Sequence, residues 1–429
     1  MLFVIAGLFL LGFAFTGGWF SRDFFHPKNS SNQSSDVQRD IYLSFLTEVY
    51  DTILTNYWNK IPEDQLVNLF QLSTESLIAK PFPDQYKTKD DFLKLMKNAL
   101  AEIKPEKKKE FTVTLTDMVL AHLEPFNRSR LYTQKDETSL SENVQNINRQ
   151  TDRYEILGVG KNASSDEIQK KYEEKTKDLK TKNTPEAKQQ LAEVEKAYQT
   201  LADEKNRQLY NQSGIEPTII YKLVHPDILY LHLTKFSPTT LDELKNVTEK
   251  FDKDSGPTSL ILDLRSNIGG SIDLLPYFLG PFIGPDQYAY QFFHQGEKTD
   301  YKTRTGWLAS LTRYKKTVVL VNQETQSTAE VAASVLKKYN VGVLVGTTTK
   351  GWGTIEKVFP LTQQIDQNEK YSIFLVHSLT LKEDGQPIEG KGVEPAINIK
   401  DPDWEKQLYN YWHYQELVAE VQKIINQPD

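Results

Sequence analysis

Residues 318–339 read VVLVNQETQSTAEVAASVLKKY, and in this stretch a β-rich run turns directly into a helical run. The apolar residues before Asn322 are β-branched or leucine, which favours a strand. The segment AEVAASVLKKY that follows has the spacing of a helix. A strand that leads straight into a helix is typical of an α/β domain.

The same alternation extends to both sides of residues 318–339. Further β-rich runs read TIIYKLV, ILYLHL, SLILDL, VGVLVG and YSIFLVHSLTL, and a further helical run reads LDELKNVTEKF. Alternating strands and helices predict an α/β domain, which we place at residues 217–400. The amphipathic segment WEKQLYNYWHYQELVAEVQKII predicts a C-terminal helix over residues 401–429.

Two helical regions precede the α/β domain. Apolar residues at three-to-four spacing predict an all-helical domain over residues 37–135. Residues 151–213 contain two long helical runs, in which Ser164 and Glu167 form a capping box before the first run and Thr184 precedes a first-turn proline in the second. The two runs predict a hairpin whose inward apolar face consists of Ile168, Tyr172, Leu179, Leu191, Val194, Tyr198 and Leu201.

Composition limits the classes of function. The chain of 429 residues has 51 Lys and Arg against 58 Asp and Glu, a formal net charge of −7. Such a chain has no overall basic field to gather phosphates, so we expect no nucleic acid partner. The absence of cysteine excludes disulfides, a cysteine nucleophile and metal sites built on thiolates. We expect no cofactor and no metal site.

The first twenty residues, MLFVIAGLFLLGFAFTGGWF, contain no charged side chain. A helix of about 20 apolar residues is long enough to cross a bilayer. We expect residues 1–21 to be a single-pass membrane anchor, because no Lys or Arg precedes the run and no clean cleavage site follows it. A cleaved signal peptide remains the alternative, and the positive-inside rule does not fix the orientation.

Residues 151–213, which we call the J-like unit, resemble a J domain (DnaJ-like). YEILGVGKNASSDEIQKKYEE matches the opening of such domains, and AEVEKAYQTLADEKNRQLYN matches their last two helices. J domains activate ATPase chaperones with a His-Pro-Asp signature between the two long helices, where this chain has Lys180-Thr181-Lys182. The unit is therefore degenerate, and we do not expect a chaperone ATPase as its partner. His225-Pro226-Asp227 lies farther along, where proline and aspartate predict a turn before a strand.

Two positions in the α/β domain have the pattern of an acyl-transfer site. Ser327 lies between a strand and a helix, where a nucleophilic serine is exposed and the amide of Thr328 can stabilise an oxyanion. In LILDLRSNIGGSIDLL, Gly269 and Gly270 allow the backbone to approach a ligand at a helix start. The alternative interpretation of Ser327 is a plain helix N-cap, paired with Glu330.

Four motifs occur in the order and spacing of the carboxyl-terminal processing peptidases, also called tail-specific proteases. They read LILDLRSNIGG, VVLVNQETQSTAEVAA, VLVGTTTKGWGTIEKVFPL and DGQPIEGKGVEPAINI. The upstream segment LAHLEPFNRSRLYTQKDE resembles the segment before the PDZ domain of that family. The chain is identified as a member of this family. It departs from the family in one respect, because its J-like unit occupies the place of the PDZ domain. The resemblance implies a crotonase/ClpP-like α/β core.

The family uses a Ser–Lys dyad to hydrolyse polypeptides, in which a neutral lysine removes the serine proton. By resemblance, Ser327 is the nucleophile, and the amides of Thr328 and of the Gly269-Gly270 turn stabilise the oxyanion. The lysine position holds Trp352, and an indole cannot accept a proton at neutral pH.

Three other side chains bear on the missing base. The glutamine that assists the lysine is replaced by Glu356, which would hold a nearby lysine protonated. Lys350 lies two residues before Trp352, a displacement of roughly 6.6 Å along an extended chain, and reaches Ser327 only if the loop shifts. His377, on the run YSIFLVHSLTL, is a further possible base, although such a histidine is more often a packed strand residue.

Two hypotheses follow from these residues. The first is a membrane-anchored serine endopeptidase that acts on extended or C-terminal polypeptide segments, with Lys350 as a relocated base. The second is a pseudoprotease that keeps the peptide groove and binds peptides or partner proteins as an envelope scaffold. The resemblance also implies a bacterial cell membrane location, with the soluble part outside the cytoplasm.

Overall fold

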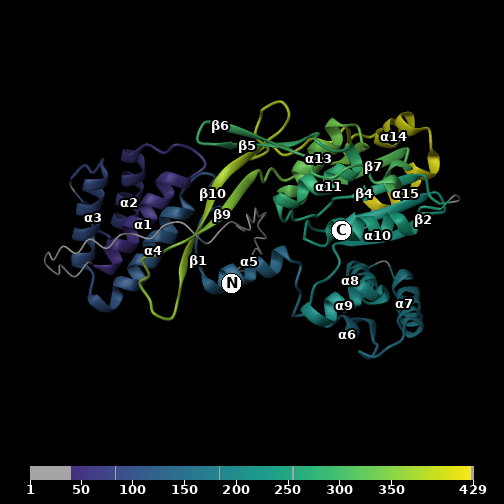
Figure 1. The fold of residues 1–429 in the computed structure, drawn as a ribbon, viewed down its shortest axis with the longest axis horizontal. Coiled ribbons are helices and arrows are strands. Elements are labelled where there is room, and N and C mark those ends of the chain that lie inside the picture. The colour runs from purple at the N-terminus through teal and green to yellow at the C-terminus, as the bar shows by residue number, and fades with distance from the viewer. Residues whose placement is uncertain (1–39, 83, 183, 254–255, 427–429) are drawn as a thin grey trace.

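The computed structural model describes residues 40–82, 84–182, 184–253 and 256–426. A helical bundle, a long antiparallel sheet and an α/β core follow one another along the molecule, and the J-like unit lies beside the core (Figure 1). The expected anchor at residues 1–21 lies outside the described residues. No helix in the part of the chain that the structure describes is long and apolar enough to span a membrane.

The N-terminal bundle is built around aromatic side chains. Tyr50 stacks on Phe92 with ring centroids 4.5 Å apart, and Phe70 contacts Phe92 edge-on at 4.9 Å. All three rings are fully buried. The bundle consists of α1 (Ile41–Asn56), α2 (Glu63–Ile78), α3 (Lys89–Glu102), η1 (Pro105–Lys107) and α4 (Lys108–Ala121).

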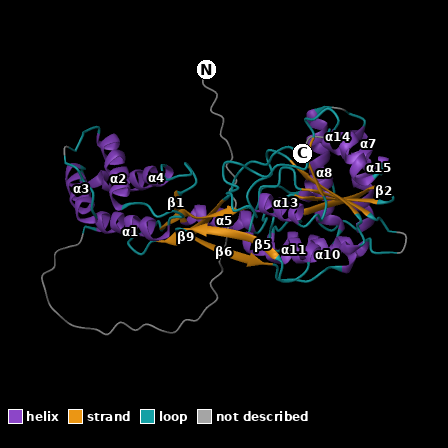
Figure 2. Ribbon diagram, turned by 90° about the horizontal axis from the view of Figure 1, so that it is seen from above, coloured by secondary structure: helices purple, strands orange, loops and turns teal. Residues whose placement is uncertain are grey.

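The expected all-helical region also contains a strand. β1 (Arg130–Thr133) pairs antiparallel with β10 (Tyr371–Leu381), a partner more than two hundred residues away that no local pattern reveals. β10 also pairs with β5 and β9, so this sheet links the bundle to the α/β core (Figures 1 and 2). The other strands of this sheet are β5 (Tyr288–His294), β6 (Glu297–Lys302) and β9 (Thr354–Pro360). The helix α5 (Gln134–Val144) follows β1 in the chain.

Within the described residues, six strands form the sheet of the α/β core, in the order β11-β8-β7-β4-β3-β2. All neighbours are parallel except β2 and β3. The expected α/β class is therefore correct. The strands are β2 (Ile219–His225), β3 (Ile228–Leu233), β4 (Ser259–Asp263), β7 (Lys316–Val321), β8 (Val343–Gly346) and β11 (Ile397–Asn398).

Helices cover both faces of this sheet. Leu260 and Leu262 of β4 face a core made with α10, α11 and α13, while Ile261 faces the C-terminal helices. These elements are α10 (Thr240–Lys250), η2 (Ile272–Leu274), α11 (Leu275–Ile283), α12 (Ala309–Thr312) and α13 (Thr328–Lys338).

The C-terminal segment differs from the single helix expected over residues 401–429. It forms α14 (Trp404–Trp412) and α15 (Gln415–Ile425), separated by His413 in a left-handed conformation with φ of 50°. A residue in this conformation ends a helix, since its amide turns back to an earlier carbonyl. The two helices fold onto each other and onto one face of the sheet.

The J-like unit is the expected helical hairpin with a short helix on each side. Ser164 and Glu167 form the predicted capping box, and Tyr172 stacks on Tyr198 with centroids 4.1 Å apart. The predicted inward face is confirmed except at Leu191, which lies outside the buried cluster. The helices are α6 (Arg153–Leu157), α7 (Ser165–Lys180), α8 (Pro185–Ala202) and α9 (Glu204–Ser213).

His225-Pro226-Asp227 forms the turn between β2 and β3, as predicted. The Asp227 carboxylate accepts hydrogen bonds from the amide and hydroxyl of Thr258, at 2.9 and 2.7 Å. It therefore fixes the turn against the start of β4, outside the J-like unit.

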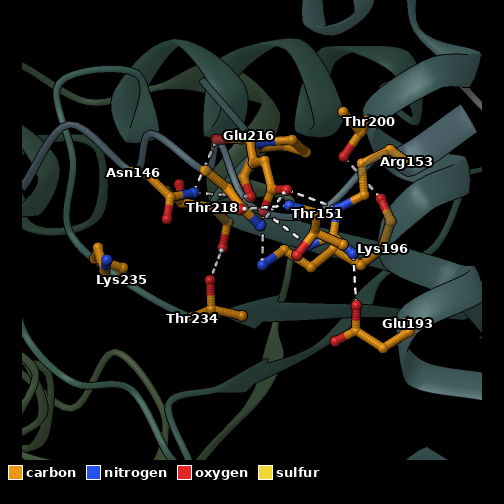
Figure 3. Close-up of polar contacts among 12 residues, drawn as sticks. Asn146, Thr151, Arg153, Glu193, Lys196, Thr200, Glu216, Thr218, Thr234 and Lys235 are labelled. Atoms are coloured by element: carbon orange, nitrogen blue, oxygen red, sulfur yellow. Dashed lines mark hydrogen bonds and ion pairs between the residues drawn. The ribbon is translucent and has the colours of Figure 1, made fainter. Parts of the chain in front are cut away.

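A buried ion-pair cluster joins the J-like unit to the α/β core (Figure 3). Glu216 lies in the linker from α9 to β2 and is 1% exposed. Its carboxylate accepts hydrogen bonds from the Arg153 guanidinium at 2.6 and 3.0 Å and pairs with Lys196 at 2.8 Å. Although burial alone would raise the pKa of Glu216, these cations and hydrogen bonds lower it below its usual value. Glu216 is thus an ionised centre that holds the J-like unit in place.

Arg153→Ala is expected to lower the free energy of unfolding by about 3 kcal/mol, because it leaves the buried Glu216 without its bidentate partner. Chemical denaturation followed by circular dichroism measures the change. Lys171→Ala is the matched control, since its pair with Glu174 is exposed to solvent and contributes little to stability. Equal losses in the two variants would contradict a structural role for the buried cluster.

Candidate active site

The turn between β7 and α13 holds Ser327 in an unusual backbone conformation. Its φ is 57° and its ψ is −127°, outside the regions that a serine ordinarily adopts. Such a conformation costs on the order of 1–3 kcal/mol and clusters at functional sites. The strain supports a special role for this residue, because a plain N-cap has extended backbone angles.

The hydroxyl of Ser327 is not used for capping. Ser327 is only 3% exposed, and its Oγ makes no hydrogen bond to any residue that the structure describes. Instead the Ser327 amide donates to the Glu330 carboxylate at 2.9 Å. Glu330 therefore satisfies the backbone of the turn and leaves the serine hydroxyl unbonded. The hydroxyl is buried, so the exposure expected of a nucleophile at this turn is not found in this conformation.

Glu330 also holds the following loop beside Ser327. Its carboxylate accepts hydrogen bonds from the Thr349 hydroxyl at 2.5 Å and from the amides of Gly351 and Trp352, both at 2.7 Å. The carboxyl group is fully buried, and this burial raises its pKa even though the donors favour the charged form. One side chain thus binds two segments that are about twenty residues apart.

The Gly269-Gly270 turn lies directly against Ser327. A Cβ on Gly269 would lie 2.7 Å from the Ser327 Cβ, and one on Gly270 would lie 2.0 Å from the Phe236 carbonyl oxygen. Both glycines have positive φ, 86° and 134°. Only glycine allows this approach of the turn to Ser327 and Phe236, whereas the expected approach to a ligand stays a prediction.

The predicted oxyanion donors need one correction. The Gly269 amide donates to the Asn267 side chain at 2.8 Å, so it is not available to a ligand. Among the described residues, the amides of Gly270 and Thr328 have no such acceptor, and the Thr328 hydroxyl donates to the Gly270 carbonyl at 2.8 Å. Gly270 and Thr328 remain the predicted donors.

Trp352, at the expected lysine position, is clamped from several sides. The ring is 4% exposed, and its Nε1 donates to Glu356 at 3.4 Å. The Arg128 guanidinium lies 3.3 Å from the ring centroid, a cation–π contact. Arg128 also pairs with Glu389 at 3.0 Å, and Glu389 accepts the Gly353 amide at 2.7 Å. The indole is therefore fixed in the interior of the site.

Glu356 is an almost fully buried carboxyl group. Burial raises its pKa from 4.5 to about 7, although hydrogen bonds from Thr354 and Trp352 and the charge of Arg128 favour the ionised form. The Thr354 hydroxyl donates to Oε1 at 2.6 Å, while Oε2 is buried without a partner among the described residues. Near neutral pH this group is half protonated.

Lys350 makes no hydrogen bond to the Ser327 hydroxyl. Its ammonium lies 3.6 Å from the Glu324 carboxylate and its side chain is 38% exposed, while its amide donates to the Thr325 carbonyl at 3.0 Å. The short contact with Ser327 that a relocated base requires is absent from this conformation. The role of Lys350 as a base stays a prediction that depends on a shift of the loop.

His377, the other possible base, makes its contacts with Ser378, Lys357 and His294. Its Nδ1 lies 2.8 Å from the Ser378 hydroxyl, its Nε2 lies 3.4 Å from the Lys357 ammonium, and its ring stacks on His294 at 4.2 Å. Burial and the charge of Lys357 lower its pKa to about 3. The structure therefore supports the packed-strand interpretation of His377.

Two residues that organise the site did not stand out in the sequence as site residues. Glu330 was visible only as the acidic partner of a possible N-cap, three residues after Ser327. Arg128 precedes β1 and reaches Trp352 only because β1 pairs with β10, and no local signal marks that contact.

The comparisons with known proteins agree with this geometry. The model of peptidase family S41 matches residues 227–399, which include the Ser327 turn, the glycine turn and the Trp352 loop. Residues 227–399 of the α/β core are therefore similar to the domain of peptidase family S41. The DnaJ domain model matches residues 152–211, which confirms the resemblance of the J-like unit.

Curated relatives match part of the chain. The carboxy-terminal processing protease CtpA of Bacillus subtilis (strain 168) is 30% identical over 193 residues, 45% of this chain and 39% of that protein. The carboxy-terminal-processing protease of Bartonella bacilliformis is 28% identical over 188 residues, 43% of this chain and 41% of that protein. The matched region thus spans about 40% of the length of these relatives.

Among solved structures, the photosystem II D1 C-terminal processing protease is similar to this chain. It is 14% identical, with a TM-score of 0.49, over 83% of this chain and 93% of that protein.

Glu356→Gln is expected to change how stability depends on pH. Because the folded pKa lies above the usual value, the unfolded chain loses its proton first, and Glu356 lowers stability as pH rises from 4.5 to about 7. The variant should therefore gain stability relative to the parent between pH 5 and 8, by up to about 3 kcal/mol. Denaturation at several pH values measures this difference. Glu297→Gln, on the exposed edge of β6, should show no such trend. A pH-independent difference for Glu356→Gln would contradict the raised pKa.

Proposed function

We propose that the S41 domain binds an extended polypeptide segment at Ser327 without hydrolysing it. The single observation that carries this proposal is the clamped Trp352 at the position where the family has its lysine. An indole N–H only donates, and here it donates to Glu356. The protein is then a pseudoprotease that binds peptides or partner proteins as a scaffold.

The lack of a base is the main argument. A general base must lie about 2.6–3.2 Å from the hydroxyl whose proton it removes, directly or through one water. Among the described residues nothing hydrogen-bonds to Ser327 Oγ, and Lys350 pairs with Glu324. Deprotonation of Ser327 therefore has no assistance in this conformation.

Binding of a polypeptide carbonyl retains its support. The Gly270 and Thr328 amides flank Ser327, and such donors bind the oxygen of a carbonyl as well as an oxyanion. The curated relatives are proteases by name, and polypeptide is the ligand class that follows from the shared domain.

The second candidate function is a weak serine endopeptidase that uses Lys350. The strained backbone and the unbonded hydroxyl of Ser327 favour it, since both are expected of a nucleophile. It requires Lys350 to leave Glu324 and lose its proton.

The decisive experiment incubates the chain without residues 1–21 with an unfolded protein and detects the products by mass spectrometry. The Ser327→Ala variant is treated in the same way for comparison. We expect no Ser327-dependent cleavage, and we expect immobilised peptide to bind both proteins equally. Cleavage that is lost in both Ser327→Ala and Lys350→Ala would replace this proposal by the weak peptidase. A folded protein that binds no peptide would remove both candidates.

A gain-of-function variant tests the role of Trp352 directly. In Trp352→Lys with Glu356→Gln, a lysine enters the base position without the carboxylate that would hold it charged, and Arg128 nearby disfavours its protonated form. We expect Ser327-dependent cleavage, about 100-fold above the parent, as for a restored acid–base group. Trp352→Phe with Glu356→Gln is the matched control and should stay inactive. An inactive, folded lysine variant would show that more than the base is missing.

We also propose that residues 1–21 anchor the chain in a bacterial cell membrane, with the rest outside the cytoplasm. The support is the uncharged apolar run at the N-terminus. The full chain should sediment with membranes and resist high salt, and protease added to intact spheroplasts should degrade it. A chain without residues 1–21 should stay in solution. Recovery of the full chain in the supernatant, shortened at its N-terminus, would favour the cleaved signal.

A further inference from the structure

Lys235 links the glycine turn of the site to the end of α5. Its ammonium donates to the Asn143 carbonyl at 2.9 Å and to the Asn143 side-chain oxygen at 2.5 Å. No ion pair of Lys235 occurs among the described residues, and burial lowers its pKa to about 8, with a further contribution from Lys196. A partly buried lysine that is held by neutral oxygens depends strongly on those two contacts.

The residue after Lys235 brackets the glycine turn. The Phe236 amide donates to the Gly269 carbonyl at 2.8 Å, and the Phe236 carbonyl accepts the Ser271 amide at 3.0 Å. The absence of a Cβ on Gly270 is what allows this approach. A shift of the Lys235–Phe236 segment therefore moves the turn that carries the Gly270 amide.

Asn143 is connected in turn to Glu216 through the linker that enters the J-like unit. The Asn146 amide donates to the Asn143 carbonyl at 3.0 Å, and the Asn146 side chain donates to the Glu216 carbonyl at 2.9 Å. Asn148 donates to the Glu216 carboxylate at 3.0 Å. Arg153 and Lys196 of the J-like unit hold the same carboxylate.

A second set of contacts runs from Glu216 to the same segment. Two residues after Glu216, the amide and hydroxyl of Thr218 donate to the buried Glu243 carboxylate at 2.7 and 3.0 Å. The Thr240 hydroxyl contacts that of Thr218 at 2.8 Å and donates to the Lys235 carbonyl at 3.3 Å. The segment before the J-like unit, through Asn143, and the segment after it, through Thr218 and Thr240, are thus both connected to Lys235.

We propose that Glu216 and Lys235 are positioning residues through which the J-like unit sets the conformation of the Gly269-Gly270 turn. This inference rests on the proposed function in one respect, because it describes how polypeptide binding at Ser327 is controlled. A partner that tilts the J-like unit would loosen or tighten the turn by way of Glu216, Asn143 and Lys235. The contacts form one continuous path, and a coupling measurement is its proper test.

The experiment measures hydrogen exchange at the amides of residues 266–271 in Glu216→Gln, in Lys235→Met and in the double variant. Glu216→Gln keeps the shape of the side chain and removes its charge, while Lys235→Met keeps the stem and removes the donors. We expect each single variant to exchange roughly two- to thirtyfold faster than the parent at this turn, the range of measured couplings. The double variant should exchange no faster than the more affected single variant, because both changes break one path.

Two controls separate positioning from general destabilisation. Glu174→Gln removes an exposed ion pair in the same J-like unit and should leave the exchange at residues 266–271 unchanged. Lys235→Arg retains the donors to Asn143 and should restore slow exchange. Unchanged exchange at the turn in both single variants would overturn the inference, as would effects that multiply in the double variant.

Unfolding of the J-like unit in one variant, or a parent protein that binds no peptide, still leaves a decisive measurement. If Glu216→Gln unfolds the J-like unit, Lys235→Met still decides, since its contacts lie outside that unit. Peptide affinity should fall by a similar factor in both single variants. If the parent binds no peptide, the proposed function fails, whereas the exchange measurement still supports or overturns the positioning role.

Discussion

The site depends on one buried carboxylate, that of Glu330. It accepts hydrogen bonds from Ser327, Thr349, Gly351 and Trp352, and thereby fixes the serine turn and the following loop relative to each other. A buried carboxyl group without such donors would be neutral or would destabilise the fold. Because the same group holds both segments, the identity of the side chain at position 352 can change while the backbone around Ser327 stays in place.

The sequence predicted the elements of the core more readily than the contacts of the site. The β-rich and helical runs, the capping box at Ser164 and the function of the glycine pair depend on local pattern or backbone conformation, which neighbouring residues determine. The strand β1 and the contact of Arg128 with Trp352 depend on pairing with β10, which lies far along the chain. The break at His413 follows from a single left-handed residue within an otherwise helical pattern. Such features are decided by tertiary structure.

Trp352, at the position where the resemblance predicts a lysine, is part of a set of matched contacts. Arg128 covers the indole face, Glu389 holds Arg128 and the Gly353 amide, and Glu356 accepts the indole N–H. A lysine in the same place would meet the positive charge of Arg128 on one side and the carboxyl group of Glu356 on the other. The surroundings therefore fit an aromatic ring, and a change of this one residue alone would leave a charged group in conflict with its neighbours.

The strained backbone of Ser327 does not by itself show that the serine still reacts. The turn must bring Ser327 within contact of Gly269, and the same backbone path places the Thr328 hydroxyl on the Gly270 carbonyl. A protein that only binds a polypeptide carbonyl needs this arrangement of amides as much as an enzyme does. The strain is thus compatible with binding as well as with catalysis, and the general base is the group whose presence or absence separates the two proposed functions.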